Sequence, residues 1–276
     1  AQLYNLDGHA DELVDPELLA AVRAAEDAAS TGGAVDEERL RALLTPTDAP
    51  NVFRLRVFTP RFCRLLLEEL EHIRASGVPL RRPNGMNRFG AILEAVPGGL
   101  GAFHETVRVL ALRFARPLAQ LAYPSLVAAA DATEHYAFCV RYRLGEDVAL
   151  AEHADASVAT LNVVLGAEPF EGGGLAFRGT RFVDDKPRDV PKRVVPLSDF
   201  APGEAILHLG GTFHEALPIT SGARENLIVW LFGEHGTVRV APHDESERLS
   251  GRERWAAWRG LGVKRPHPVC AEADAS

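Results

Sequence analysis

The feature that most limits the fold of this chain is a change of pattern near residue 135. From there on, short segments rich in β-branched and aromatic residues alternate with Gly or Pro turns. Closely spaced short strands of this kind are typical of an antiparallel sandwich or barrel. We expect strands at 136–143, 158–165, 174–179, 204–209 and 226–232.

The part of the chain before residue 135 predicts mainly helices. Thr59 and Pro60 suit the N-cap and first turn of a helix that ends at Gly77, and a later helix should break at Pro117. Helices followed by many short strands indicate an α+β fold, with the helices packed outside a β core. We expect helices at 16–29, 36–44, 60–76 and 100–121, and a strand at 52–58.

Length and composition suit a globular protein with a sizeable core. The chain has 276 residues, of which 46% are hydrophobic and 25% are charged. We expect three parts: a mainly helical N-terminal region at 1–134, a β core at 135–233, and a docked tail at 234–276 with a short helix near 251–260.

Charge and cysteine content exclude several classes of partner. The net charge of −8 argues against nucleic acid or an anionic membrane, and no apolar run approaches the roughly 20 residues of a membrane span. Cys63, Cys139 and Cys270 lie far apart without a CxxC pair, which favours reduced thiols and a cytoplasmic location. The only methionine is Met86, so a removed leader is not excluded, and the sequence makes no prediction of the oligomeric state.

The segment EHADAS places His153 and Asp155 two residues apart before a predicted strand. Side chains at i and i+2 of an extended segment point the same way, so these two would converge on one point. A polar turn is the alternative, and a metal site needs a third ligand. His214 is our candidate because Arg224 follows it ten residues later, after a Pro-x-x-x-Gly turn; His208 lacks that arrangement and stays the alternative ligand.

The combination of these residue types indicates a particular chemistry. Two imidazoles and one carboxylate form the facial triad that leaves open positions on a non-haem ferrous ion. A structural zinc site would use four ligands, usually with thiolates, and the chain has no cysteine cluster. The planar guanidinium of Arg224 could hold a distal carboxylate through two hydrogen bonds.

The stretch from Phe138 to Phe232 resembles the iron(II)- and 2-oxoglutarate-dependent dioxygenases, in particular their prolyl 4-hydroxylase-like branch. It contains FCVRYRLGEDVALAEHADAS, TLNVVLGAEPFEGGGLAF and PGEAILHLGGTFHEALPITSGARENLIVWLF in that order. The segments YRLGEDV and RPNGMN are also similar to those of proteins named for a 2-oxoglutarate and iron-dependent oxygenase domain.

The resemblance implies a double-stranded β-helix (jelly-roll) core and a set of site residues. His153, Asp155 and His214 would bind Fe(II), Arg224 would bind the C5 carboxylate of 2-oxoglutarate, and Tyr142 would face that cosubstrate. The implied cofactors are Fe(II), 2-oxoglutarate and O₂, with ascorbate as an optional addition.

The implied reaction couples decarboxylation of 2-oxoglutarate to succinate and CO₂ with hydroxylation of an unactivated C–H bond. Asp155 occupies the position that a halide would need, so hydroxylation is favoured over halogenation. The branch favours a prolyl or lysyl residue of a protein or peptide as substrate. The alternatives are a free amino acid or natural product, or a metal-binding jelly roll that lost catalysis and serves as an interaction module.

Strand alternation nominates further residues of the pocket. Arg224, Asn226, Ile228 and Trp230 should share one face of the last strand, and Thr160, Asn162 and Val164 one face of an earlier strand. Asn162 and Trp230 are therefore candidate substrate residues, although a tryptophan inside a barrel is often only core. Val164 stands where animal oxygen-sensing relatives have a second tyrosine that helps bind the cosubstrate.

Two further segments have open interpretations. RRPNGMNRFG at 81–90 is either a turn with a solvated basic rim or a lid in which Asn84, Asn87 and Arg88 touch substrate. The run Gly172–Gly174 is interpreted as a turn and bulge instead of an anion cradle, because no strand-to-helix context surrounds it.

Overall fold

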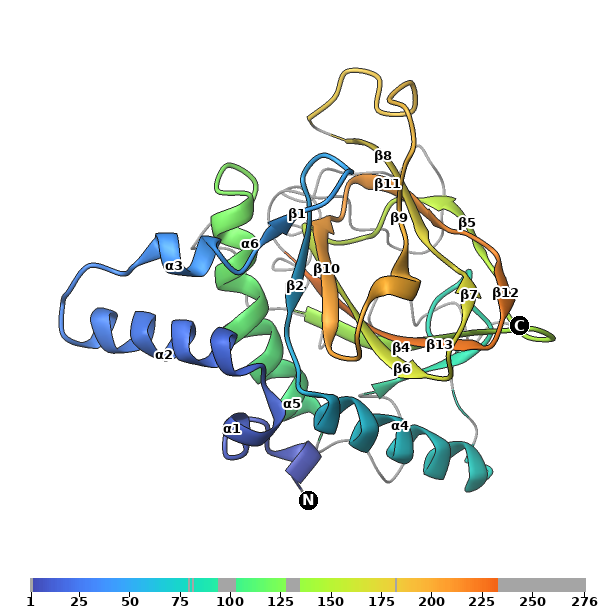
Figure 1. Cartoon of the computed structure of the whole chain (residues 1–276), viewed down its shortest axis with the longest axis horizontal. Coiled ribbons are helices and arrows are strands. Elements are labelled where there is room, and N and C mark those ends of the chain that lie inside the picture. The colour runs from blue at the N-terminus through green and yellow to red at the C-terminus, as the bar shows by residue number, and fades with distance from the viewer. Residues whose placement is uncertain are drawn as a thin grey trace, which may run out of the picture.

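Two antiparallel β-sheets enclose the functional part of the molecule (Figure 1). The computed structural model describes residues 2–78, 80, 82–93, 103–127, 135–181 and 183–232. The larger sheet has seven strands in the order β1-β2-β10-β6-β13-β4-β3, the smaller has four in the order β5-β11-β8-β9, and β12 pairs with β7.

The bounds of the strands follow the sheets. The larger sheet contains β1 Thr45–Pro46, β2 Val52–Arg56, β3 Gly90–Ile92, β4 His135–Arg143, β6 Ala159–Ala167, β10 Glu204–Leu209 and β13 Ala223–Leu231. The smaller contains β5 Leu150–His153, β8 Leu175–Thr180, β9 Arg193–Val195 and β11 Thr212–Ala216; β7 is Glu171–Gly172 and β12 is Ile219–Ser221.

The helices lie beside the larger sheet, and local signals explain their ends (Figure 1). The Asp15 side chain accepts from the N–H groups of the first turn of α2. Pro60 opens α4, and Gly77 follows its end with a φ of 72°, a left-handed conformation that suits glycine. The bounds are α1 Ala10–Leu13, α2 Pro16–Ser30, α3 Glu37–Arg41, α4 Pro60–Ala75, α5 Phe103–Val109 and α6 Arg116–Ala122.

The helix expected at 100–121 is irregular before Pro117, and not at it. A π-helical segment, Leu110–Ala115, joins α5 to α6, and Pro117 lies in the first turn of α6. Proline has no N–H to donate to the carbonyl four residues earlier, so a wider turn ahead of it accommodates the missing bond.

The two faces of the larger sheet pack against different partners. On β13, Leu227, Val229 and Leu231 belong to an apolar cluster shared with the helices. Ile228 and Trp230, which alternate with them, belong to a second cluster shared with the smaller sheet. The alternation therefore separates a helix side from an interior side, and the site lies on the interior side.

The expected strands are all present: 204–209 has the expected bounds, and the ends of 136–143, 158–165, 174–179 and 226–232 are shifted. Among the described residues, no helix is long and apolar enough to cross a membrane. The tail expected at 234–276, with its helix near 251–260, lies outside the described residues.

Candidate metal centre and cosubstrate pocket

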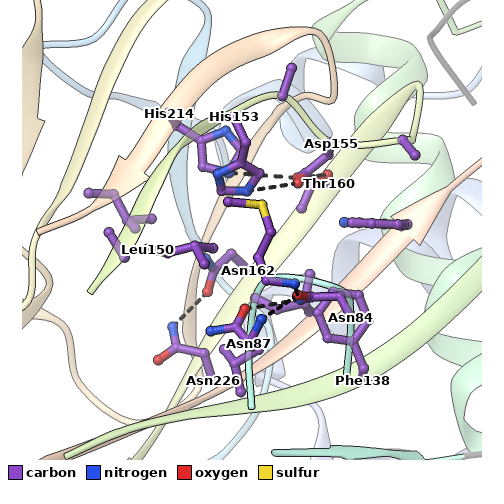
Figure 2. A pocket seen from close by; sticks show the side chains of 18 of the residues that line it. Asn84, Asn87, Phe138, Leu150, His153, Asp155, Thr160, Asn162, His214 and Asn226 are labelled. Atoms are coloured by element: carbon purple, nitrogen blue, oxygen red, sulfur yellow. Dashed lines mark hydrogen bonds and ion pairs between the residues drawn. The ribbon is translucent and has the colours of Figure 1, made fainter. Parts of the chain in front are cut away.

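Two neighbouring strands of the smaller sheet bring the site histidines together. His214 of β11 lies directly opposite His153 at the end of β5, and their ring centroids are 4.3 Å apart. The register of β11 shifts on both sides of His214, and bulges of this kind re-aim side chains next to active sites. Figure 2 shows both imidazoles facing Asp155.

Asp155 follows β5 and is fixed by hydrogen bonds to both its backbone and its side chain. Its N–H donates to Gly210 O at 2.8 Å, and Thr160 Oγ1 donates to its Oδ2 at 2.7 Å. Oδ1 lies 3.4 Å from His153 Nε2, and Oδ2 lies 3.8 Å from His214 Nε2. One ligand atom from each of the three residues lies within 4.8 Å of the others.

The tautomer of each histidine follows from its hydrogen bond. His153 Nδ1 lies 2.8 Å from Ala151 O, and His214 Nδ1 lies 2.9 Å from Thr212 O. A carbonyl oxygen only accepts, so each Nδ1 carries a proton and each Nε2 is the ring nitrogen nearer to Asp155. This is the arrangement in which histidine binds a metal through Nε2.

Burial and the neighbouring side chains shift the pKa values of His214 and Asp155. Burial lowers the pKa of His214 to about 3, so the imidazole is neutral at neutral pH. Burial alone would raise the pKa of Asp155, but His214 and His153 beside it hold the pKa well below its usual range. Two imidazoles and one carboxylate form a donor set that fits a ferrous ion with open positions.

His208 lies next to this group but is not part of it. It is fully buried on β10, and its Nε2 is 3.8 Å from Asp155 Oδ2 without a hydrogen-bond partner among the described residues. Its ligand atom does not join the cluster of His153, Asp155 and His214. The geometry thus favours His214 as the third ligand over His208.

Arg224 is a buried cation on β13, 2% exposed, that lines the same cavity. One of its terminal nitrogens donates to Gly173 O, and its Nε has no hydrogen-bond partner among the described residues. Its guanidinium carbon lies 4.6 Å from the centre of the Tyr142 ring. Burial lowers the pKa of Arg224 to about 10, so it stays charged at neutral pH with no carboxylate of the described residues against it. A buried charge of this kind needs an anionic partner that the described residues do not supply.

The cavity that joins these groups has a volume of about 250 Å³. Of the predicted substrate residues, Asn84, Asn87, Asn162 and Trp230 line it. Arg88 is exposed and is not among the lining residues, because its backbone N–H is held by Asp147 outside the cavity.

Strand alternation placed the pocket residues as expected. Arg224, Asn226, Ile228 and Trp230 all line the cavity, as do Thr160 and Asn162. Val164 is buried in the interior apolar cluster without lining the cavity. Asn226 Nδ2 donates to Asn162 Oδ1 at 2.6 Å (Figure 2). Asn226 Oδ1 has no hydrogen-bond partner in the part of the chain that the structure describes.

Some residues of the site were not predicted as such. Strand alternation predicted only which face of its strand Thr160 occupies, and no sequence motif indicates its hydrogen bond to Asp155. Gly173 has a φ of 62° and accepts the Arg224 bond through its carbonyl. The Gly172–Gly174 run was the available signal for a close backbone approach, although it was interpreted only as a turn.

Comparisons with known proteins show what the chain is similar to. Residues 1–128 match the family model described as the OGFOD2-like domain. The mouse "2-oxoglutarate and iron-dependent oxygenase domain-containing protein 2" is 36% identical over 232 residues, which cover 84% of this chain and 62% of that protein. The mouse "Procollagen-lysine,2-oxoglutarate 5-dioxygenase 1" is 30% identical over 194 residues, which cover 67% of this chain and 24% of that protein. The chain thus spans less than two thirds of either relative.

A solved structure shares the fold. The epimerase SnoN in complex with Fe³⁺, α-ketoglutarate and nogalamycin RO matches with a TM-score of 0.51 and 16% identity, over 78% of this chain and 91% of that chain. The resemblance expected from the motifs, to iron- and 2-oxoglutarate-dependent oxygenases, is confirmed by these sequence relatives. That class implies iron and 2-oxoglutarate, and the donor set and the buried Arg224 fit both.

Proposed function

We propose that this chain is an Fe(II)- and 2-oxoglutarate-dependent dioxygenase that hydroxylates an unactivated C–H bond and releases succinate and CO₂. One observation carries the proposal. A buried, anion-seeking Arg224 lines the same cavity as a group of two imidazoles and one carboxylate. A metal-binding interaction module would have no use for a desolvated guanidinium in that position.

The residues divide the work. His153, Asp155 and His214 would hold Fe(II) through two Nε2 atoms and a carboxylate oxygen, and Thr160 keeps Asp155 oriented. Arg224 would bind the C5 carboxylate of 2-oxoglutarate, with Tyr142 beside it. The bound iron would supply the oxidation of 2-oxoglutarate by O₂, for which ascorbate is an optional reductant.

We propose a prolyl or lysyl side chain of a protein or peptide as the prime substrate. A relative that is 30% identical bears the name of a procollagen-lysine dioxygenase, which supports this class. The cavity of about 250 Å³ lies below the roughly 300–1,000 Å³ typical of small-molecule sites, and the cosubstrate would fill part of it. The remaining space suits one side chain better than a whole polycyclic molecule, which makes a small-molecule substrate the second candidate. Asn162 and Trp230 are the proposed substrate contacts, with Asn84 at the rim.

We further propose that residues 1–134 are a mainly helical region packed outside a jelly-roll core at 135–233. The apolar cluster shared by the helices and the larger sheet supports this division. The same region also contributes β1, β2 and β3 to the sheet, so it belongs to the core's framework as well.

The test is metal-dependent turnover. The protein reconstituted with Fe(II) without oxygen should bind one iron per chain and, once O₂ is admitted, convert 2-oxoglutarate to succinate. In a screen of prolyl- and lysyl-containing peptides, a peptide that is a substrate should raise the rate of succinate formation and become heavier by one oxygen atom. The absence of iron-dependent succinate formation in both assays would reject the function.

A further inference from the structure

The segment 83–89 between α4 and β3 reaches into the cavity and is held at both ends. Asp147 Oδ2 accepts from the backbone N–H groups of Arg88, at 2.6 Å, and Phe89, at 3.1 Å. At the other end, Tyr136 Oη donates to Pro83 O at 3.1 Å. The four residues between these anchors, Asn84, Gly85, Met86 and Asn87, line the cavity.

A chain of hydrogen bonds fixes the orientation of two amides in this segment (Figure 2). Asn84 Oδ1 accepts from the N–H groups of Met86, at 2.8 Å, and Asn87, at 2.7 Å. Because those groups only donate, the Nδ2 end of Asn84 must face away from them, and it donates to Asn87 Oδ1 at 3.0 Å. The Nδ2 end of Asn87 is thereby turned toward Tyr142 Oη, 3.2 Å away.

This orientation decides where the phenol proton of Tyr142 can go. Toward Asn87 the phenol oxygen is an acceptor, so its own proton is left for another partner. None of the described residues accepts it. Burial raises the pKa of Tyr142, so the proton stays on the phenol. The Tyr142 ring lies against Arg224, so the cavity contains two donors, the phenol O–H and Arg224 Nε, for which the described residues provide no acceptor.

We propose that Asn87 is a positioning residue for the cosubstrate. By donating to Tyr142 Oη, it leaves the phenol proton to donate to the carboxylate that Arg224 binds. The inference rests on the proposed function, since that carboxylate is the C5 carboxylate of 2-oxoglutarate. Asn87 is 1% exposed and the segment is anchored at both ends, so the residue belongs to the cosubstrate side of the pocket and not to a mobile substrate lid.

The test is a double-mutant cycle read as binding, without turnover. Isothermal titration calorimetry would measure Mn(II) binding, and then 2-oxoglutarate binding to the Mn(II)-loaded protein, for wild type, Asn87→Ala, Tyr142→Phe and the double variant. The control is Arg88→Ala, which changes the next residue of the same segment but an exposed side chain outside the cavity lining. Asn87→Asp is a second, isosteric variant whose carboxylate would accept the phenol proton.

We expect Asn87→Ala to weaken 2-oxoglutarate binding about 3- to 10-fold, and Tyr142→Phe, which loses a hydrogen bond to a charged carboxylate, to weaken it about 10- to 150-fold. The double variant should bind no more weakly than Tyr142→Phe, Arg88→Ala should match wild type, and Mn(II) affinity should be equal in all. Additive losses, or wild-type affinity in both Asn87→Ala and Asn87→Asp, would overturn the role of Asn87 alone. A wild type that binds Mn(II) but not 2-oxoglutarate would instead overturn the proposed function, and this inference with it.

Discussion

Buried polar groups differ between the two faces of the larger sheet, because one on the helix side has a charged partner and several on the interior side have none among the described residues. On the helix side, Glu225 of β13 is 2% exposed and forms an ion pair with Arg74 of α4. On the interior side, its neighbour Arg224 is as deeply buried but meets no carboxylate of the described residues. Three other groups that line the cavity also lack partners among the described residues: His208 Nε2, Asn226 Oδ1 and Trp230 Nε1.

The difference separates groups that stabilise the fold from groups that await a ligand. A buried polar group without a partner costs free energy, whereas a paired one contributes modestly to stability. Four such groups around one cavity are therefore informative, because a bound cosubstrate and substrate could complete them. Substitutions on the helix side should change stability, and substitutions on the interior side should change binding.

The largest effect is expected at the metal ligands. Separate replacement of His153, Asp155 and His214 by Ala should remove bound iron and take turnover below detection, because a facial triad has no ligand to spare. Metal analysis together with succinate release measures this. His208→Ala is the matched control and should retain iron; loss of iron there, with retention in His214→Ala, would reverse the ligand assignment.

On the helix side, Arg74→Met should lower the free energy of unfolding by about 3–5 kcal/mol, because it leaves the buried carboxylate of Glu225 unpaired. Chemical denaturation measures the loss. The affinity for 2-oxoglutarate of the folded fraction should not change. A loss below about 1 kcal/mol would mean that the pair does not stabilise this face.

On the interior side, Arg224→Ala should weaken 2-oxoglutarate binding by about 2–5 kcal/mol, or about 30- to 5,000-fold, since it removes one partner of a buried charge pair. Iron content should stay the same. An unchanged Michaelis constant for 2-oxoglutarate would contradict the assignment of Arg224.

One substitution on the interior side should stabilise the protein when no cosubstrate is bound, in contrast to the loss expected for Arg74→Met. Arg224→Met should raise the free energy of unfolding by about 1–3 kcal/mol in buffers free of carboxylate anions, because it removes a desolvated charge that lacks an anionic partner. Addition of 10 mM 2-oxoglutarate should raise the free energy of unfolding of wild type but not that of Arg224→Met, as measured by chemical denaturation. Destabilisation of Arg224→Met without cosubstrate would show that the cation is already paired in the free protein.

The sequence predicted the helix side and the larger sheet more completely than the smaller sheet. The strands with alternating or continuous apolar residues, such as β4 and β10, were expected close to their observed bounds. The short strands β5 and β11, which contain His153 and His214, were not expected as strands, because their polar residues serve the site and β11 is bulged. The triad itself was expected from spacing and resemblance.

What could not be read from the sequence is contact between distant segments. Asn87 and Tyr142 are 55 positions apart, and Gly173 and Arg224 are 51 apart. The two residues of each pair lie on different elements, so the periodicity of a single helix or strand could not predict their contact. The segment 81–90 was left between a turn and a lid for this reason, whereas its amides extend toward the cosubstrate side.

The smallest effect compares two buried tyrosines, one on each face. Tyr123 Oη, on the helix side, donates to Asn51 O at 2.8 Å and Leu207 O at 3.1 Å, so its proton is used within the fold. Tyr142 Oη, on the interior side, accepts a hydrogen bond from Asn87, and its own proton remains available for a ligand.

Tyr123→Phe should therefore lower the free energy of unfolding by about 0.5–1.5 kcal/mol, with unchanged affinity for 2-oxoglutarate. Tyr142→Phe should weaken that affinity by about 1.5–3 kcal/mol, because it removes a hydrogen bond to a charged carboxylate. It should also lower the free energy of unfolding by about 0.5–1.5 kcal/mol, because the buried Asn87 Nδ2 loses its acceptor. Denaturation and calorimetry on both variants measure the contrast; equal stability losses without a difference in affinity would show that the two faces use their tyrosines alike.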